Sequence, residues 1–200
     1  SDIALKHGGT IDKFIGDAIL VFFGDPESRG VTEDAKACVR MALDMQDRLA
    51  ALNVKWRKLG AEEPFRIRIG INTGFCNVGN FGSADRMDYT ILGAEANLAA
   101  RLQTNAPPDG IVASYETYAL VSDIVSARAL PPMAMKGISR EVVPYLIEGP
   151  LKGDGTAQII NEHGDGVDFY LNLEKMDTER AAKVREMLRQ ALAALEQRKP

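Results

Sequence analysis

Two short segments of this chain hold residue types that could do chemistry. The first runs from Lys13 to Asp17 (KFIGD), where a carboxylate follows a glycine between two apolar runs. A carboxylate at such a turn is held on rigid backbone with little steric cover. This suits a hard cation such as Mg²⁺, which takes one or two carboxylates and fills its other positions with phosphate and water. A Gly-Asp turn by itself is structural far more often than catalytic.

The second segment runs from Asp88 to Leu102 (DYTILGAEANLAARL). Asn97 and Arg101 are four residues apart on a predicted helix, so both side chains project from one face. An amide beside a guanidinium is suited to holding a ribose and to stabilising charge on a phosphoryl oxygen. An isolated pair of this kind is more often part of a solvated helix face, so the pair alone establishes no site.

Regular elements are predicted around both segments. The apolar runs Thr10 to Ile15 and Ala18 to Phe23 are joined only by Gly16-Asp17, which is typical of a β-hairpin. Apolar residues three and four apart then indicate a helix that is capped at Thr32 and ends near Lys58. Further strands are expected at 65–73, 75–81, 89–92, 111–113, 127–135 and 142–148, and further helices at 95–103 and from 114.

The order of these elements predicts an α+β fold, in which an antiparallel sheet carries helices on one face. We expect residues 1–150 to form this domain and residues 151–200 to form a strand-plus-helix extension. The extension has an alternating strand at 167–173 and a helix capped by Asp177. The run from Ser1 to His7 is typical of the end of a helix stopped by two glycines, so we expect the chain to be a fragment of a longer protein.

Composition excludes several classes of function. The 200 residues carry 24 Lys+Arg and 28 Asp+Glu, a formal net charge of −4. This balance argues against wrapping a nucleic-acid backbone, which needs a clustered basic face. The apolar runs are far shorter than the ~20 residues that span a bilayer. Cys38 and Cys76 lie in apolar segments. We expect both to be reduced thiols in the core of a cytoplasmic protein.

Taken together, three segments resemble the class III nucleotidyl cyclases in order and spacing. They are KFIGDAILVFFG, RIRIGINTG and DYTILGAEANLAAR, within a resemblance that covers about Thr10 to Glu148. The family has a ferredoxin-like palm and converts a nucleoside triphosphate into the 3′,5′-cyclic monophosphate. The resemblance implies a bacterial signal-transduction lyase with two Mg²⁺ or Mn²⁺ ions, at sites shared across a homodimer. It also implies an upstream sensory or membrane domain, which would tether the cytoplasmic domain to the inner membrane face.

The resemblance implies a role for each residue that matches the family's motifs. Asp17 matches one of two metal-binding aspartates. Asn97 matches the asparagine that orients the ribose, and Arg101 the arginine that stabilises the pentavalent transition state. Two residues match triphosphate-binding positions, Arg68 in RIRIGINTG and Lys136 in MAMKGI.

The purine-binding pair implied by the resemblance is Lys13 with Thr90. A Lys paired with Asp or Thr is similar to adenylate cyclases, whereas guanylate cyclases usually hold Glu and Cys there. Lys13 can donate to adenine N1, and the Thr90 hydroxyl can accept from the exocyclic amine. Because a hydroxyl both donates and accepts, it discriminates less sharply than a carboxylate. ATP is the expected substrate, and guanylate cyclase activity is the alternative.

One part of the family's pattern does not fall within this chain. The other metal-binding aspartate belongs to a first strand with a motif resembling Phe-x-Asp-Ile-x-Gly-Phe, which would precede Ser1. We expect the natural protein to contain that strand, and the 200 residues alone to be inactive. A non-catalytic nucleotide-binding or dimerisation module remains a second hypothesis. The related GGDEF cyclases are disfavoured because IGDA is not their signature turn.

Overall fold

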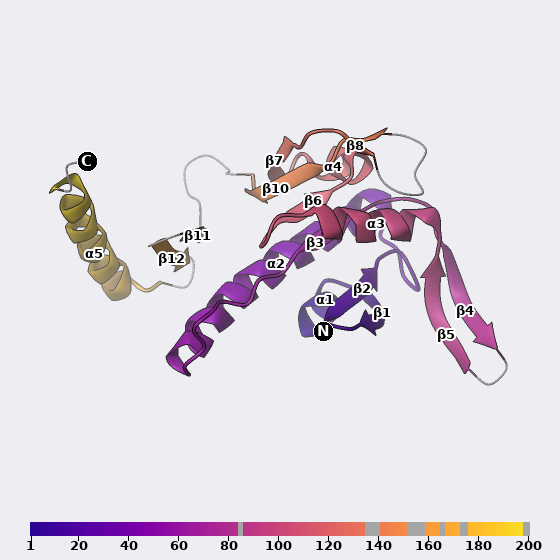
Figure 1. The fold of residues 1–200 in the computed structure, drawn as a ribbon, viewed down its shortest axis with the longest axis horizontal. Coiled ribbons are helices and arrows are strands. Elements are labelled where there is room, and N and C mark those ends of the chain that lie inside the picture. Colours follow the sequence, from indigo (N-terminus) through magenta and orange to yellow (C-terminus); the bar gives the residue numbers. More distant parts are fainter. Residues whose placement is uncertain (84–85, 135–140, 152–158, 165–166, 173–175, 198–200) are drawn as a thin grey trace. The chain divides into compact units, whose positions relative to one another are not determined.

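The computed structural model describes residues 1–83, 86–134, 141–151, 159–164, 167–172 and 176–197. The chain divides into two compact units, Ser1–Leu151 and Lys152–Pro200. The first unit holds every motif that suggests chemistry. Its ribbon is shown in Figure 1.

The predicted hairpin is present near the N-terminus. After the short helix α1 (Asp2–Lys6), strand β1 (Thr10–Ile15) pairs antiparallel with β2 (Ala18–Phe22). Gly16 in the connecting turn has φ +63°, a conformation that glycine adopts without steric cost. The register shifts between Ile11 and Lys13, so Asp12 is an extra residue in β1, as in a β-bulge.

The long helix α2 (Val31–Lys58) supplies one side of the core. The predicted cap at Thr32 is wrong, because the helix already begins at Val31 and Gly30 precedes it without a side-chain cap. Glu33 and Asp34 in the first turn complement the positive end of the helix dipole instead. The buried cluster on this helix comprises Ala35, Val39 and Ala42, with Ile71, Ile111, Ala113, Val121, Val125 and Ile147.

A four-stranded sheet forms the centre of the first unit. Its order is β3 (Ile69–Ile71), β6 (Ile111–Ala113), β10 (Tyr145–Pro150), β7 (Val125–Ala129), with β3 parallel to β6 and the other pairs antiparallel. Ile111, Val112 and Ala113 are all buried, so β6 is covered on both faces. The apolar residues of α2 pack with Ile111 and Ala113, whereas those of α3 (Ala94–Asn105) pack with Val112.

The fold is α+β, as predicted, but helices cover both faces of this sheet instead of one. The close approach of α3 to β3 depends on Gly70. A Cβ at this position would run into the backbone oxygen of Ala99 and the backbone nitrogen of Gln103. Leu98 and Leu102 form the buried face of α3. The small helix α4 (Tyr115–Val121) joins the α2 side through Val121.

Several predicted strands are shorter than expected, each for a local reason. Residues 65–68 precede β3 because side chains satisfy their backbone: Asn53 bonds both polar groups of Phe65, and Asp109 accepts from Ile67. The predicted strand at 127–135 is split into β7 and β8 (Met133–Ala134) by two prolines. That at 142–148 is split around Pro144 into β9 (Glu141–Val142) and β10. Proline has no N–H to donate to a sheet.

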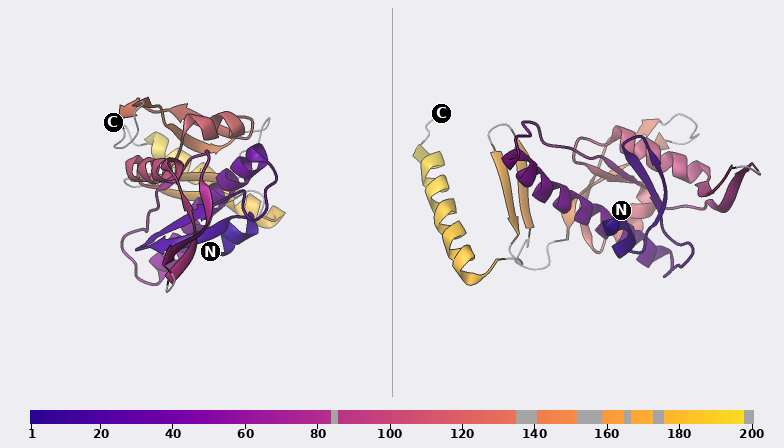
Figure 2. Two further views of the ribbon diagram at one scale, coloured as in Figure 1. Left: turned by 90° about the vertical axis from the view of Figure 1, so that its right-hand side faces the viewer. Right: turned by 90° about the horizontal axis from the view of Figure 1, so that it is seen from below.

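A long hairpin extends from the start of α3. Strands β4 (Asn77–Ser83) and β5 (Arg86–Leu92) pair antiparallel and reach further than the sequence predicted. The hairpin points away from the sheet, as Figure 1 and the right-hand view of Figure 2 show. It leaves Phe81, Met87, Tyr89 and Leu92 exposed.

The second unit contains an antiparallel pair, β11 (Ile159–Gly164) and β12 (Val167–Asn172), and then α5 (Thr178–Gln197). Strand β12 and the helix were predicted, whereas β11 was not. The Asp177 carboxylate accepts from the Arg180 N–H at 2.7 Å, which is the predicted N-cap. Within the described residues, every helix is too short or too polar to cross a membrane.

Candidate active site

Lys13 and Thr90 lie 77 residues apart in the sequence and meet in the structure. Lys13 on β1 donates from Nζ to Thr90 Oγ1 on β5 at 2.9 Å. Thr90 is only 5% exposed, whereas 40% of the Lys13 side chain is accessible. The pair therefore forms a polar spot whose inner part is buried and whose outer part can still reach a ligand.

Asp12, which no sequence motif indicated, completes this polar group. Its side chain is fully buried. Oδ2 accepts from the Thr90 hydroxyl at 2.6 Å and from the Ile91 N–H at 3.1 Å. Oδ1 lies 3.2 Å from Lys13 Nζ. Neighbouring residues of a regular strand point to opposite faces, so Asp12 and Lys13 reach the same group only because β1 has its extra residue at Asp12.

Asp17 lies on the turn between β1 and β2, and its side chain is exposed. An exposed carboxylate suits a hydrated divalent cation. No cluster of three or more His, Cys, Asp or Glu side chains that could hold a metal ion occurs in the part of the chain that the structure describes. Asp17 thus fits one ligand of a metal site, but the described residues do not complete a site for two ions.

Asn97 and Arg101 are both exposed on α3, one turn apart, as their spacing predicted. The Arg101 carbonyl accepts from the Asn105 side chain, which leaves the guanidinium out of this contact. Among the described residues of one chain, no hydrogen bond or ion pair joins either side chain to Asp17 or Lys13. Within one subunit, the residues expected to act together are therefore not joined by a direct polar contact.

Arg68 already has a structural contact. Its Nη1 donates to the Thr104 carbonyl at 3.1 Å, near the C-terminal end of α3 where helix carbonyls lack intrahelical partners. Arginine has five N–H donors, so this bond leaves others for a ligand. Lys136, the other residue expected at the triphosphate, lies outside the described residues.

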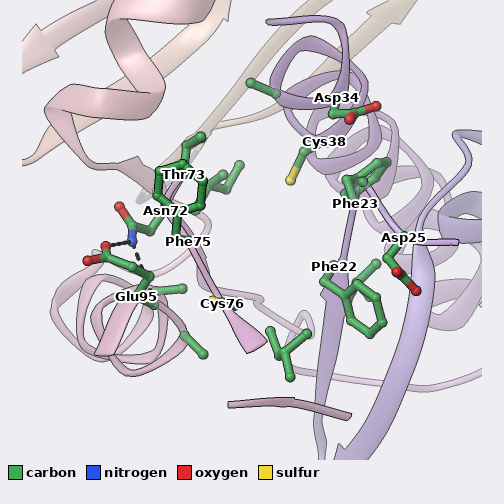
Figure 3. A pocket seen from close by; sticks show the side chains of 18 of the residues that line it. Phe22, Phe23, Asp25, Asp34, Cys38, Asn72, Thr73, Phe75, Cys76 and Glu95 are labelled. Atoms are coloured by element: carbon green, nitrogen blue, oxygen red, sulfur yellow. Dashed lines mark hydrogen bonds between the residues drawn. The ribbon is translucent and has the colours of Figure 1, made fainter. Parts of the chain in front are cut away.

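A pocket of about 380 Å³ lies between β2 and β3, with α2 and α3 contributing to its walls. Figure 3 shows Phe22 and Phe23 on one side and Asn72 and Glu95 on the other. Asn72 donates from Nδ2 to Glu95 Oε2 at 2.7 Å, while its buried Oδ1 has no hydrogen-bond partner. In the described chain β2 pairs only with β1, and β3 only with β6. The pocket is therefore bounded by two strands that each have one unpaired edge.

Cys38 also borders this pocket. Burial raises the pKa of its thiol to about 12, so the thiol is protonated at neutral pH. Burial likewise raises the pKa of Cys76. Neither cysteine is in a disulfide. A protonated thiol is a poor nucleophile, so neither residue supplies covalent chemistry.

The palm-like α+β unit and its polar residues on β1, β5 and α3 define the catalytic domain of a class III nucleotidyl cyclase. The chain belongs to the family described as the adenylate and guanylate cyclase catalytic domain, whose family model matches residues 4–149. This confirms the resemblance and the ferredoxin-like palm expected from the sequence. The match ends within the last strand of the first unit.

Solved structures of both kinds of cyclase are similar to this chain. The adenylyl cyclase CyaB from P. aeruginosa is 49% identical with a TM-score of 0.71, over 73% of this chain and 74% of that one. The guanylyl cyclase Cya2 is 36% identical with a TM-score of 0.69, over 78% and 77%. Similarity alone therefore does not decide between the two substrates.

Curated relatives are much longer than this chain. Adenylate cyclase 1 of Rhizobium meliloti (strain 1021) is 33% identical over 160 residues, which are 79% of this chain but 24% of that protein. Adenylate cyclase 2 of the same organism is 28% identical over 81% of this chain and 44% of its own length. The chain thus spans less than half the length of each of these relatives.

Proposed function

We propose that this domain is an adenylate cyclase that converts ATP into 3′,5′-cyclic AMP and pyrophosphate. The observation that carries the proposal is the contact between Lys13 and Thr90. It gathers a cationic donor and a hydroxyl at one spot, although the two residues belong to strands that are distant in the sequence. A nucleotide base recognised there would meet both groups along one edge.

The donors and acceptors of this pair favour adenine. Adenine presents an acceptor at N1 and a donor at its exocyclic amine, whereas guanine presents a donor at N1 and an acceptor at O6. The Lys13 ammonium only donates, so it matches adenine N1 and opposes guanine N1–H. Thr90 can accept from the adenine amine. A mismatched edge leaves polar groups unpaired, which is the strongest source of discrimination in a polar site.

The reaction is an in-line displacement at the α-phosphorus. The ribose 3′-oxygen forms a new bond to that phosphorus, the bond to the β-phosphate oxygen breaks, pyrophosphate leaves, and the hydroxyl proton passes to solvent. Asn97 holds the ribose, and Arg101 stabilises the charge that builds on the equatorial oxygens. Arg68 and Lys136 bind the triphosphate. Positioning and charge stabilisation supply most of the acceleration.

Asp17 is the carboxylate of this chain that would hold Mg²⁺ or Mn²⁺. When bound, two such ions lower the pKa of the 3′-hydroxyl and neutralise the triphosphate. The second carboxylate comes from a strand that precedes Ser1 and lies in the pocket between β2 and β3. The two unpaired strand edges that bound this pocket support this arrangement. Pairing with both would satisfy their free backbone groups and join two sheets into one.

The sites are shared across a homodimer. This accounts for the exposure of Asp17, Asn97 and Arg101, which no direct polar contact joins in one subunit. It also gives a partner to the exposed apolar side chains of the β4–β5 hairpin and to Phe75, which is fully exposed. Exposed large apolar side chains favour a protein partner over water when they gather into one patch. A twofold interface would form two equivalent sites.

The test compares two chains, the 200 residues and a longer form that includes the preceding strand. Each is incubated with ATP or with GTP and Mn²⁺, and the cyclic nucleotide is identified by mass. We expect cyclic AMP from the longer form only. Cyclic GMP as the main product would overturn the choice of base. No product from either nucleotide, despite a folded dimer, would favour a non-catalytic nucleotide-binding module.

A further inference from the structure

We propose that Asp12 is a positioning residue that sets the base preference of this site by fixing the direction of the Thr90 hydroxyl. The inference rests on the proposed function, because it concerns how the same spot chooses between adenine and guanine. The observations that carry it are the full burial of the Asp12 side chain and its contacts with Thr90, Ile91 and Lys13.

Asp12 can only accept hydrogen bonds as a carboxylate. Its Oδ2 lies 2.6 Å from Thr90 Oγ1, so the Thr90 hydroxyl must donate its single proton in this contact. The Ile91 N–H donates to the same oxygen at 3.1 Å and holds the carboxylate in place. The hydroxyl proton of Thr90 therefore points to Asp12 and is not available to a ligand.

What remains on Thr90 is its two lone pairs. One accepts from Lys13 Nζ at 2.9 Å, and the other is left for a ligand. A threonine that can rotate freely would accept from the adenine amine or donate to guanine O6. With Asp12 in place, the Thr90 hydroxyl acts only as an acceptor, as a carboxylate at this position would.

Asp12 also aligns Lys13. The Lys13 ammonium has three N–H donors. One bonds to Thr90 Oγ1, and the charged group lies 3.2 Å from Asp12 Oδ1 in an ion pair. A further N–H can donate to adenine N1. Since 40% of the Lys13 side chain is accessible, this donor can reach a ligand. Both halves of the base-reading pair therefore take their orientation from one buried carboxylate.

The experiment measures kcat/KM for ATP and for GTP in the longer chain, with and without Asp12→Asn. The amide oxygen of Asn can accept either from Ile91 and Thr90 or from Lys13. In either orientation the NH₂ group of the amide faces one of the remaining donors, which it cannot pair with. We expect the ATP:GTP ratio to fall about tenfold, the size of one hydrogen bond. The matched control is Asp44→Asn, which removes a carboxylate that pairs with Lys6 and His7 elsewhere, and should leave the ratio unchanged.

Variants of Thr90 test the same inference when Asp12→Asn folds poorly. Thr90→Ser keeps the hydroxyl on Asp12 and should retain the ratio, whereas Thr90→Val should lower it. Because Asp12 acts partly through Thr90, the two substitutions should not be independent. The double variant Asp12→Asn with Thr90→Val should change the ATP:GTP ratio by less than the product of the changes in the two single variants. An equal fall in kcat/KM for both nucleotides, with the ratio unchanged, would reduce Asp12 to a structural role.

Binding keeps this inference separate from the proposed activity. ATP and GTP are each used to displace a fluorescent ATP analogue from the same variants, without turnover. A chain that makes no cyclic nucleotide but prefers ATP, and loses that preference in Asp12→Asn, contradicts the proposed function alone. A wild-type chain that binds ATP and GTP equally contradicts the inference.

Discussion

The Thr90 hydroxyl on β5 donates to the Asp12 carboxylate on β1 at 2.6 Å, across 78 positions of sequence. This contact joins the β1–β2 hairpin to the β4–β5 hairpin, and Lys13 binds to both residues. The base of a nucleotide would therefore be read by two strands whose relative position depends on one buried carboxylate. Any change that separates these hairpins should alter substrate choice as well as stability.

Arg101→Ala should lower kcat by about 100- to 1,000-fold with a much smaller change in KM, because the guanidinium acts on charge that is present only in the transition state. The side chain is exposed, so the melting temperature should stay unchanged. Steady-state kinetics and thermal unfolding of the longer chain check both points. Arg40→Ala, at an exposed position of α2, serves as the control. A raised KM with an unchanged kcat would instead assign Arg101 to substrate binding.

Mixing Asp17→Ala with Arg101→Ala chains should restore activity that neither variant has alone. Each heterodimer would carry one intact site, so random exchange of equal amounts should give about a quarter of the wild-type rate. The measurement is cyclic AMP formation before and after subunit exchange. Sites built within single subunits would give no rescue at any mixing ratio.

Gly70→Ala should destabilise the first unit by about 1–3 kcal/mol or more, because a Cβ there overlaps the backbone of α3. Urea unfolding followed by circular dichroism measures the change. The control is Gly79→Ala, where the nearest atom to a Cβ is Phe81 Cε2 at 3.7 Å, an ordinary contact. Equal stability of the two variants would mean that α3 moves away from β3 without cost.

Because of Cys38, we expect the free energy of unfolding to fall at alkaline pH. Burial raises the pKa of the Cys38 thiol from an ordinary value of 9.0 to about 12 in the folded chain, so folding favours the protonated form. This contribution is complete below pH 9 and is lost as the pH rises toward 12, at up to about 1.4 kcal/mol per pH unit. Urea unfolding at pH 8, 10 and 11 should show a steeper loss in wild type than in Cys38→Ala. Parallel pH profiles would contradict the burial of this thiol.

The pocket between β2 and β3 predicts a difference in amide exchange between the two chain lengths. Backbone amides on the free edges of Leu20–Phe22 and Ile69–Ile71 should exchange more slowly in the longer chain, because a strand between them would accept their hydrogen bonds. Hydrogen–deuterium exchange with mass spectrometry measures this. The β11–β12 pair in the second unit serves as an internal reference whose exchange should not change. Identical exchange at β2 and β3 would place the preceding strand elsewhere.

Local patterns predicted the elements that depend on local chemistry. The Gly16-Asp17 link predicted the β1–β2 hairpin, the three-four spacing predicted α2, and Asp177 predicted the cap of α5. Strands that depend on distant partners were predicted less well. The sequence of residues 65–68 alternates like a strand. The partner strand β6 begins only at Ile111, which pairs with Ile69, so residues 65–68 have no strand to pair with, and side chains such as Asn53 bond to their backbone instead.

The sequence by itself determined the family, the residue types at its motif positions and the shared helix face of Asn97 and Arg101, because all of these follow from residue identity and short spacing. Only the tertiary structure decided that Asp12 belongs with Lys13 and Thr90. Successive residues of a regular strand point to opposite faces, so no sequence pattern places Asp12 beside Lys13. The extra residue in β1 is set by the register of β1 with β2, and the packing of β5, which is distant in the chain, then brings the three side chains together.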